Sequence, residues 1–148
     1  MNQPHTGLYK AYNRATHTVN KTRQVVMLYD GMIRFLQHAH EAIEKKDYET
    51  RYNKLTRVSD ILIGLQSCLD FEAGASAAQV LFDFYSAMDK RIFALHRSND
   101  AQACLAIINE LKEMRDVWSR IDCASETSEP QAANPAGSVP VDTSTISA

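Results

Sequence analysis

The sequence contains five histidines, which are the first candidates for catalytic or metal-binding chemistry. His38 and His40 are two residues apart, so on a helix they point in different directions and do not converge on one ion. No Glu-x-x-His pair occurs, although a di-iron helical bundle would need one. His96 lies near the expected end of a helix, where the helix dipole favours a positive charge. The sequence therefore predicts no metal site, no cofactor and no catalytic residue.

The histidines nevertheless leave a second function class open, because histidine phosphotransfer proteins are also small helical bundles with an exposed histidine. Nothing around His38 or His40 supports that chemistry beyond their helical placement. The chain has no GxGxxG or GxxxxGK[ST] phosphate-binding loop, and its three cysteines show neither CxxC nor CxxCH spacing. A histidine phosphotransfer protein or another four-helix signalling adaptor stays as the alternative interpretation.

The composition is that of one domain without a strongly charged surface. The 148 residues carry a formal net charge of −2, which divides into +1 for residues 1–122 and −3 for the remainder. A nucleic-acid-binding domain would normally show a basic stripe, so we expect no nucleic-acid partner. The N-terminus lacks the apolar core of a secretory signal, and no run of about 18 apolar residues could cross a bilayer. We therefore expect a cytoplasmic protein without membrane insertion.

The elements that would position a site are helices, because apolar residues recur at steps of three and four between Asn20 and Asp122. The expected helices run from after Asn20 to Ile43, from about Asp47 to Leu69, from Ser76 to Leu95, and from Asn99 or Asp100 to Ile121. Asp47, Ser76 and Asn99 or Asp100 are side chains that can cap helix N-termini. Connections of about 3–6 residues make successive helices antiparallel neighbours. The predicted fold is all-α, an antiparallel up-down four-helix bundle occupying residues 20–122.

The two ends of the chain differ from the bundle. Residues 1–19 contain a short apolar stripe at helical spacing, which predicts a helical cap segment too brief to be stable alone: Leu8, Tyr9, Tyr12 and Ala15. Residues 8–16 either dock on a groove of the bundle until a partner arrives or form a permanent fifth helix. Residues 123–148 contain three of the four prolines and no aromatic side chain, which predicts a disordered acidic tail.

The apolar stripes of the first two helices are wider than a bundle core requires. Val26 and Ile33 lie beside the main stripe of the first helix, and Ile61 begins a run of three consecutive aliphatic residues in the second. Part of this surplus belongs to a broad core, and the rest could form an exposed groove that accepts an amphipathic helix. The predicted partner-binding residues are Tyr9 and Tyr12 in the cap, and Val26, Ile33, Ile61 and Leu65 in the groove.

Several short stretches, taken in order, carry a family resemblance. They are Ala11-Tyr12; Met27-Leu28-Tyr29-Asp30-Gly31 followed by Ile33, Phe35-Leu36, Ala39 and Ala42-Ile43; Asp60-Ile61, Leu65, Ser67, Leu69-Asp70, Glu72 and Gly74; Phe84-Tyr85, Met88 and Arg91; Asn99-Asp100 and Trp118. No single stretch is specific, but their order and spacing resemble the flagellin-specific export chaperones of bacterial flagella, the FliS family. The resemblance extends over nearly all of residues 9–118.

This resemblance implies a function without catalysis. Chaperones of this family bind the polymerisation-prone C-terminal segment of flagellin and keep it from assembling in the cytoplasm. They also help to deliver it to the export gate of the flagellar type III secretion system. The implied partners are therefore the flagellin C-terminal segment and an export gate component. Whether the free protein forms a homodimer through its groove stays open.

Overall fold

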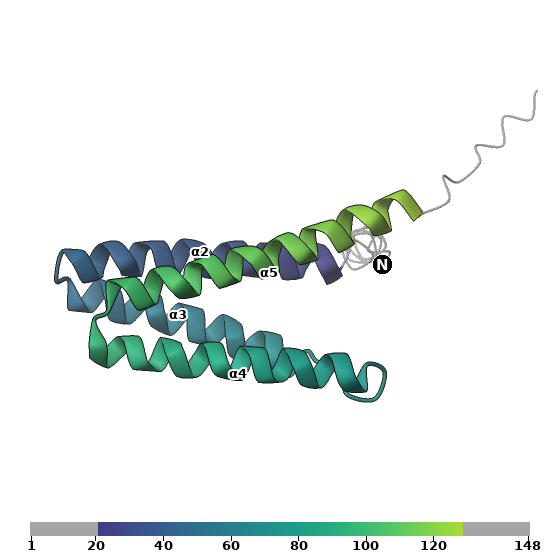
Figure 1. Ribbon diagram of the computed structural model, residues 1–148, viewed down its shortest axis with the longest axis horizontal. Coiled ribbons are helices and arrows are strands. Elements are labelled where there is room, and N and C mark those ends of the chain that lie inside the picture. Colours follow the sequence, from purple (N-terminus) through teal and green to yellow (C-terminus); the bar gives the residue numbers. More distant parts are fainter. Residues whose placement is uncertain (1–20, 129–148) are drawn as a thin grey trace, which may run out of the picture.

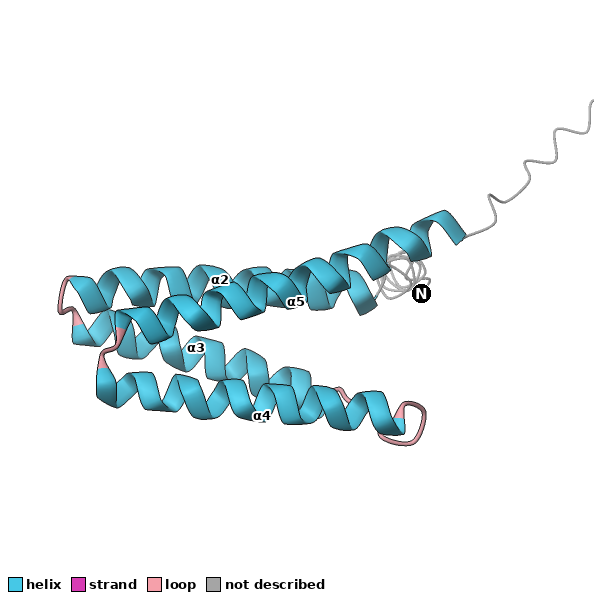
Figure 2. Cartoon of the chain, in the orientation of Figure 1, coloured by secondary structure: helices cyan, strands magenta, loops and turns pink. Residues whose placement is uncertain are grey.

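Four helices form an antiparallel up-down bundle in the computed structural model, which describes residues 21–128 (Figures 1 and 2). They are α2 (Lys21–Glu44), α3 (Tyr48–Ser67), α4 (Ala75–Ser98) and α5 (Ala101–Ser128). No strand occurs among these residues. The predicted all-α four-helix bundle is therefore confirmed. The expected cap segment, with Tyr9 and Tyr12, lies outside the described residues.

Two of the predicted helix starts coincide with capped N-termini. Asp47 precedes α3, and its Oδ1 accepts a hydrogen bond of 3.1 Å from the backbone N–H of Thr50. Asp100 precedes α5 and accepts one of 3.0 Å from the N–H of Ala103. Asn99 instead ends α4 in the left-handed conformation, with φ at 51°. The two neighbouring residues thus divide the capping between them, because Asn tolerates left-handed φ and Asp accepts well at an N-cap.

The start of α4 differs from the prediction, because Gly74 and not a serine occupies the capping position. Ser76 already lies inside the first turn of the helix. The preceding turn is organised by Asp70, whose Oδ1 accepts hydrogen bonds of 3.0 Å from the N–H groups of Glu72 and Ala73. Its carbonyl oxygen also accepts one of 3.1 Å from the N–H of Gly74. The chain therefore enters α4 without a side-chain cap.

The last helix, α5, continues to Ser128, six residues past the expected end of the bundle at Asp122. Residues 123–128 were expected to belong to the tail, but they contain no proline or glycine, and the next proline is Pro130. A helix can therefore continue through this stretch, since nothing in it removes a backbone donor or favours another conformation. Residues 129–148 lie outside the described part of the chain.

The core is built from all four helices and is apolar. Its largest fully buried side chains are Tyr29, Tyr85, Met32, Leu36, Leu55, Leu62, Ile92, Leu95, Ile107, Leu111, Val58 and Cys104. Burying a Leu or Ile side chain contributes about 1.5–3 kcal/mol, so this cluster supplies the main stabilisation of the bundle. No polar or charged residue is fully buried among the described side chains.

The bundle is asymmetric, and this asymmetry decides where a groove can form. The α2 helix packs along both α3 and α5, and α4 packs along α3. Two interhelical hydrogen bonds join α3 to α4, from Ser59 to Asp89 at 2.7 Å and from Gln66 to Ser86 at 2.9 Å. The α4 and α5 helices make few close backbone approaches, and they diverge with distance from the turn that connects them (Figure 1).

Candidate partner-binding surface

A groove lies between α4 and α5 where the two helices have diverged. Its volume is about 370 Å³, and all of its lining residues are uncharged: Ser76, Ala77, Val80 and Leu81 from α4, and Met114, Val117, Trp118 and Ile121 from α5. Several of these side chains are open to solvent although they are apolar, since Val80 is 67% exposed, Ile121 48% and Val117 40%. Apolar side chains that gather in a hollow mark a binding surface more often than isolated exposed ones do.

Beside the groove, the core contains a cluster of aromatic rings with polar atoms. The Tyr29 hydroxyl donates a hydrogen bond of 3.3 Å to the Tyr85 hydroxyl, and both rings are almost completely buried. Burial raises the pKa of Tyr29 well above its usual range, the bond to Tyr85 adds to the increase, and Trp118 acts in the opposite direction. Burial also raises the pKa of Tyr85. Both phenols therefore stay neutral and serve as packing groups.

Ion pairs hold α5 in place and set one end of the groove. Arg115 of α5 contacts Asp30 of α2 at 2.8 Å, which fixes α5 against α2. Nearer the α4–α5 turn, Arg91 of α4 contacts Glu110 of α5 at 2.7 Å. Both pairs are partly exposed, so each contributes at most about 1 kcal/mol, and their main effect is geometric. The apolar groove lies between the Arg91–Glu110 pair and the diverging ends of the two helices.

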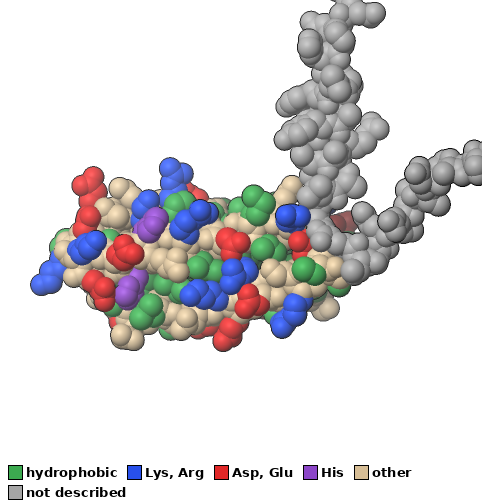
Figure 3. Space-filling view, turned by 90° about the horizontal axis from the view of Figure 1, so that it is seen from above, with side chains coloured by type: hydrophobic (Ala, Val, Ile, Leu, Met, Phe, Trp, Pro, Cys, Tyr) green, Lys and Arg blue, Asp and Glu red, His purple; other side chains and the backbone are tan. Residues whose placement is uncertain are grey.

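The face formed by α2 and α5 differs from the uncharged α4–α5 groove because it carries many charged side chains. There, basic and acidic side chains are interspersed with single apolar ones, without a large patch of either charge (Figure 3). A surface of this kind is typical of a solvated face and selects for no strongly charged partner. The contrast makes the uncharged α4–α5 groove the more distinctive of the two surfaces.

The structure places the predicted groove residues on α2 and α3, away from the α4–α5 groove. Ile33 and Leu65 belong to the buried core, with exposed fractions of 6% and 5%. Val26 and Ile61 are half-buried, and Ile61 lies within 3.7 Å of the position that a Cβ at Gly31 would take. In the described structure Ile33, Leu65 and Ile61 pack within the bundle. Contact of these three residues and Val26 with a partner stays a prediction, as does that of Tyr9 and Tyr12.

The groove residues that sequence reasoning missed carry a recognisable signal. Val80 is followed by Leu81, and Val117 by Trp118, so each helix has an apolar residue beside its main stripe. The same signal is present in α2 and α3, where the adjacent helices bury most of it. Only the packing of the helices decides whether a wide apolar stripe is covered by an adjacent helix or stays exposed to solvent.

The titratable side chains do not assemble into a metal site in this part of the molecule. No group of three or more His, Cys, Asp or Glu side chains between residues 21 and 124 is placed to hold a metal ion. The Cys104 thiol is buried beside the carbonyl oxygen of Leu36, and burial raises its pKa to about 11, which keeps it protonated and unreactive. His96 packs edge-on against Tyr52, and burial together with the charge of Arg51 lowers its pKa.

Taken together, the fold and the groove define a small all-helical bundle with an exposed apolar surface. Comparison with known proteins gives the family: a model of the family described as "Flagellar protein FliS" matches residues 5–125. The chain belongs to the FliS family.

Similar curated proteins come from several bacteria and are named flagellar secretion chaperone FliS. The Campylobacter jejuni protein is 27% identical over 114 residues, which cover 76% of this chain and 89% of the relative. The Vibrio cholerae protein is 30% identical over 97 residues, covering 66% and 71%, and the Bacillus subtilis protein is 26% identical over 114 residues, covering 76% and 84%. Chaperones are not an enzyme class. Among the described helices, none is long and apolar enough to span a membrane.

Proposed function

We propose that this protein is a cytoplasmic chaperone that binds the C-terminal segment of flagellin, prevents its premature polymerisation and aids its export through the flagellar type III secretion apparatus. The observation that carries the proposal is the uncharged groove between α4 and α5 in a chain of the FliS family. Hand-over would require a second contact, with an export gate component. The family assignment favours this function over the histidine phosphotransfer alternative.

The groove has the apolar chemistry expected for an amphipathic client helix. Its lining runs from Ser76 to Leu81 on α4 and from Met114 to Ile121 on α5. At 1.5 Å per residue these stretches rise roughly 8 Å and 10 Å, enough for about two turns of a bound helix. Apolar client residues three and four positions apart would fit against Val80, Val117 and Ile121. The Arg91–Glu110 pair would then lie near one end of the bound helix and could be matched by its polar residues.

Coupled folding explains how a preformed bundle could act on a disordered client. A client segment that is unfolded when free becomes helical only as its apolar face is buried, so part of the interaction energy is used to order it. The resulting complex would be tight enough to hold the segment and still reversible at export. A rigid groove favours this exchange, because the bundle itself need not reorganise.

The cap segment is the proposed competitor for the groove in the free protein. Residues 8–16, with Tyr9 and Tyr12, would cover apolar surface between deliveries and leave when the client binds. A second copy of the chain is the alternative occupant, which would give a homodimer. Deletion of residues 1–17 should speed client association if the segment competes, whereas an unchanged association rate would contradict a displaceable cap. Sedimentation of the free protein distinguishes the homodimer from the capped monomer.

The direct test of the client site is calorimetry of the full chain against the last ~50 residues of the cognate flagellin, the upper range for a wrapping segment. Trp118 is the only tryptophan in the sequence and lines the groove, so its fluorescence reports occupancy independently. We expect binding with a gain of helicity and a shift of the Trp118 emission. Absence of binding and of added helicity would reject the chaperone function.

A matched pair of variants locates the site. Val80 and Phe93 both lie on α4 with nearly equal exposure, 67% and 66%, but only Val80 lines the groove. Val80→Asp should weaken client binding at least tenfold, because it removes about 1.5 kcal/mol of apolar burial and places a charge against the client. Phe93→Asp should bind like the unmodified protein. If the two variants lost affinity equally, the client would not bind at the α4–α5 groove.

A further inference from the structure

A second hollow lies on the other side of the bundle, between α2 and α3. Its volume is about 530 Å³, and its lining differs from that of the apolar groove: Phe35, Asn53, Lys54, Thr56, Arg57 and Asp60. No residue lines both sites, and the two hollows are formed by different helix pairs. Its volume is within the range of ordinary ligand sites. The surface could therefore be occupied while the α4–α5 groove holds a client.

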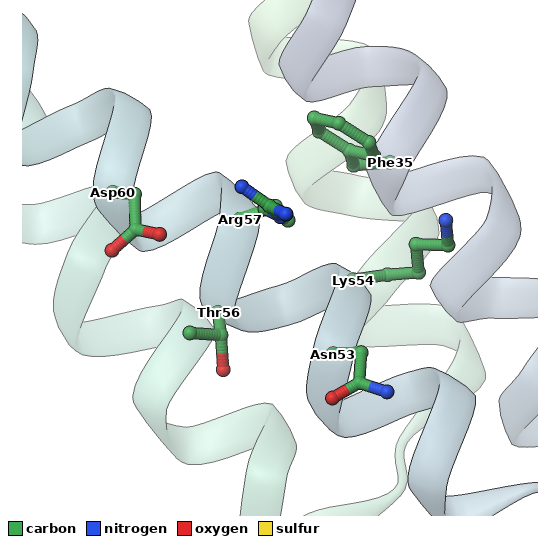
Figure 4. A pocket seen from close by; sticks show the side chains of 6 residues that line it. All are labelled: Phe35, Asn53, Lys54, Thr56, Arg57 and Asp60. Carbon is green, nitrogen blue, oxygen red and sulfur yellow. The ribbon is translucent and has the colours of Figure 1, made fainter.

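The hollow combines two cations with an aromatic ring. The Lys54 ammonium lies 5.5 Å from the centre of the Phe35 ring, which positions the charge at the mouth of the seam. Figure 4 shows the Lys54 side chain extending toward α2, from which Phe35 projects, with Arg57 seen end-on beside this seam and Asp60 pointing away from it. The positive charges and the ring thus face the same space, and the single carboxylate lies at its edge.

Neither cation is neutralised by a neighbour. Among the described side chains, no ion pair joins Lys54 or Arg57 to a carboxylate. Arg57 is exposed and Lys54 half-buried, so both charges are available to a binding group. An aromatic ring between two such cations also offers a contact for an apolar side chain next to a carboxylate.

We infer that the α2–α3 hollow is a docking site for an acidic protein segment that carries carboxylates beside a large apolar side chain. Charge complementarity selects this partner: carboxylates face Lys54 and Arg57, and the apolar side chain lies on Phe35. Asp60 at the edge disfavours a longer run of negative charge and so sets the limit of the acidic stretch. Nucleic acid fits less well, because two cations give little of the counterion release on which its binding depends.

The experiment is an NMR titration of the full, isotope-labelled chain with two blocked octapeptides, GELFDEGS and its uncharged counterpart GQLFNQGS. We expect the acidic peptide to shift the backbone signals of residues 34–36 and 53–60, and the uncharged peptide to shift them much less. Raising the NaCl concentration from about 50 mM to about 500 mM should weaken binding of the acidic peptide, because salt screens exposed ion pairs. Equal shifts with both peptides, or shifts located elsewhere, would overturn the inference.

Charge-matched variants separate this site from a general effect of net charge. Lys54→Gln with Arg57→Gln should weaken the acidic peptide roughly fivefold, since each exposed pair contributes a modest amount. Lys90→Gln with Arg97→Gln removes one lysine and one arginine from the exposed surface of α4 and should leave the affinity unchanged. If both double variants lost affinity equally, no specific site would exist.

Two further measurements complete the test. Phe35→Leu keeps an apolar side chain but removes the ring. It should lower the affinity for the acidic peptide by a smaller factor than the loss of the two cations does. An unchanged affinity would show that the Phe35 ring does not contact the peptide. Val80→Asp, in the other groove, should leave the acidic peptide unaffected. Failure of this inference is therefore distinguishable from failure of the proposed client site.

Discussion

Gly64 gives a sharp test of how the helices of this bundle are stabilised. It lies inside α3 and is exposed, and a Cβ added at this position would meet no atom within 4 Å. No described glycine has a positive φ, so an alanine can adopt the same backbone conformation. Gly64→Ala should then stabilise the protein by about 0.8–1.0 kcal/mol, the difference between the two residues in a helix interior. The gain comes from the unfolded chain, which loses conformational freedom, and not from a new contact.

Urea unfolding followed by far-UV circular dichroism measures this effect. With a denaturant slope of about 2 kcal/mol/M, the midpoint should rise by roughly 0.5 M, and the thermal midpoint by about 4 °C. Gly31→Ala should give a similar gain, because its Cβ would lie at an ordinary contact distance of 3.7 Å from Ile61 Cδ1. Ala87→Gly, at an exposed position inside α4, should shift the midpoint by the same amount in the opposite direction. A midpoint that is unchanged or lowered by Gly64→Ala would refute the argument.

Three further predictions concern helix ends and one histidine. Lys46 has a φ of 56°, a backbone conformation that glycine adopts freely. Lys46→Gly should therefore raise the urea midpoint by the equivalent of about 1 kcal/mol. A lower midpoint would show that the lysine side chain contributes more to stability than the relieved backbone strain. Asp100→Ala removes the acceptor for the N–H of Ala103 and should lower the free energy of unfolding by about 1 kcal/mol. Asp100→Asn should retain most of the capping stabilisation, and urea unfolding of both variants measures the difference. Burial and Arg51 hold the folded-state pKa of His96 below its ordinary value of 6.5, so its contribution to stability is complete above that pH and is lost as the pH falls through the folded-state pKa. The free energy of unfolding measured across this range should fall less steeply in His96→Gln, and an identical fall would exclude His96 as the cause.

The helices could be predicted because their signals are local. Apolar spacing and the acceptors Asp47 and Asp100 depend on residues only a few positions apart, and both capped ends were found where expected. The start of α4 was misplaced because Asp70 organises the preceding turn through several backbone groups, which composition does not reveal. The apolar pattern predicts the end of α5 too early, because it stops near Asp122 whereas the polar stretch that follows contains no helix breaker.

The groove could not be located from sequence because its position depends on how far each pair of helices stays in contact. Wide apolar stripes occur in several helices, and the sequence gives no reason to choose among them. In the structure, Ile33 and Leu65 are covered by adjacent helices, whereas Val80 and Val117 are not. The difference arises from helix packing, which is a property of the whole bundle and not of any one stripe.

The open groove also bears on why these apolar residues are present. The α5 helix packs along α2, with the Arg115–Asp30 pair across this contact, and α4 packs along α3, with the Ser59–Asp89 hydrogen bond across that one. Each of the two helices thus packs on another helix, and Val80, Val117 and Ile121 stay exposed between them. Exposed aliphatic side chains contribute little to folding, since burial is the source of their stabilisation. The proposed client helix would cover them and supply this stabilisation without any rearrangement of the four helices.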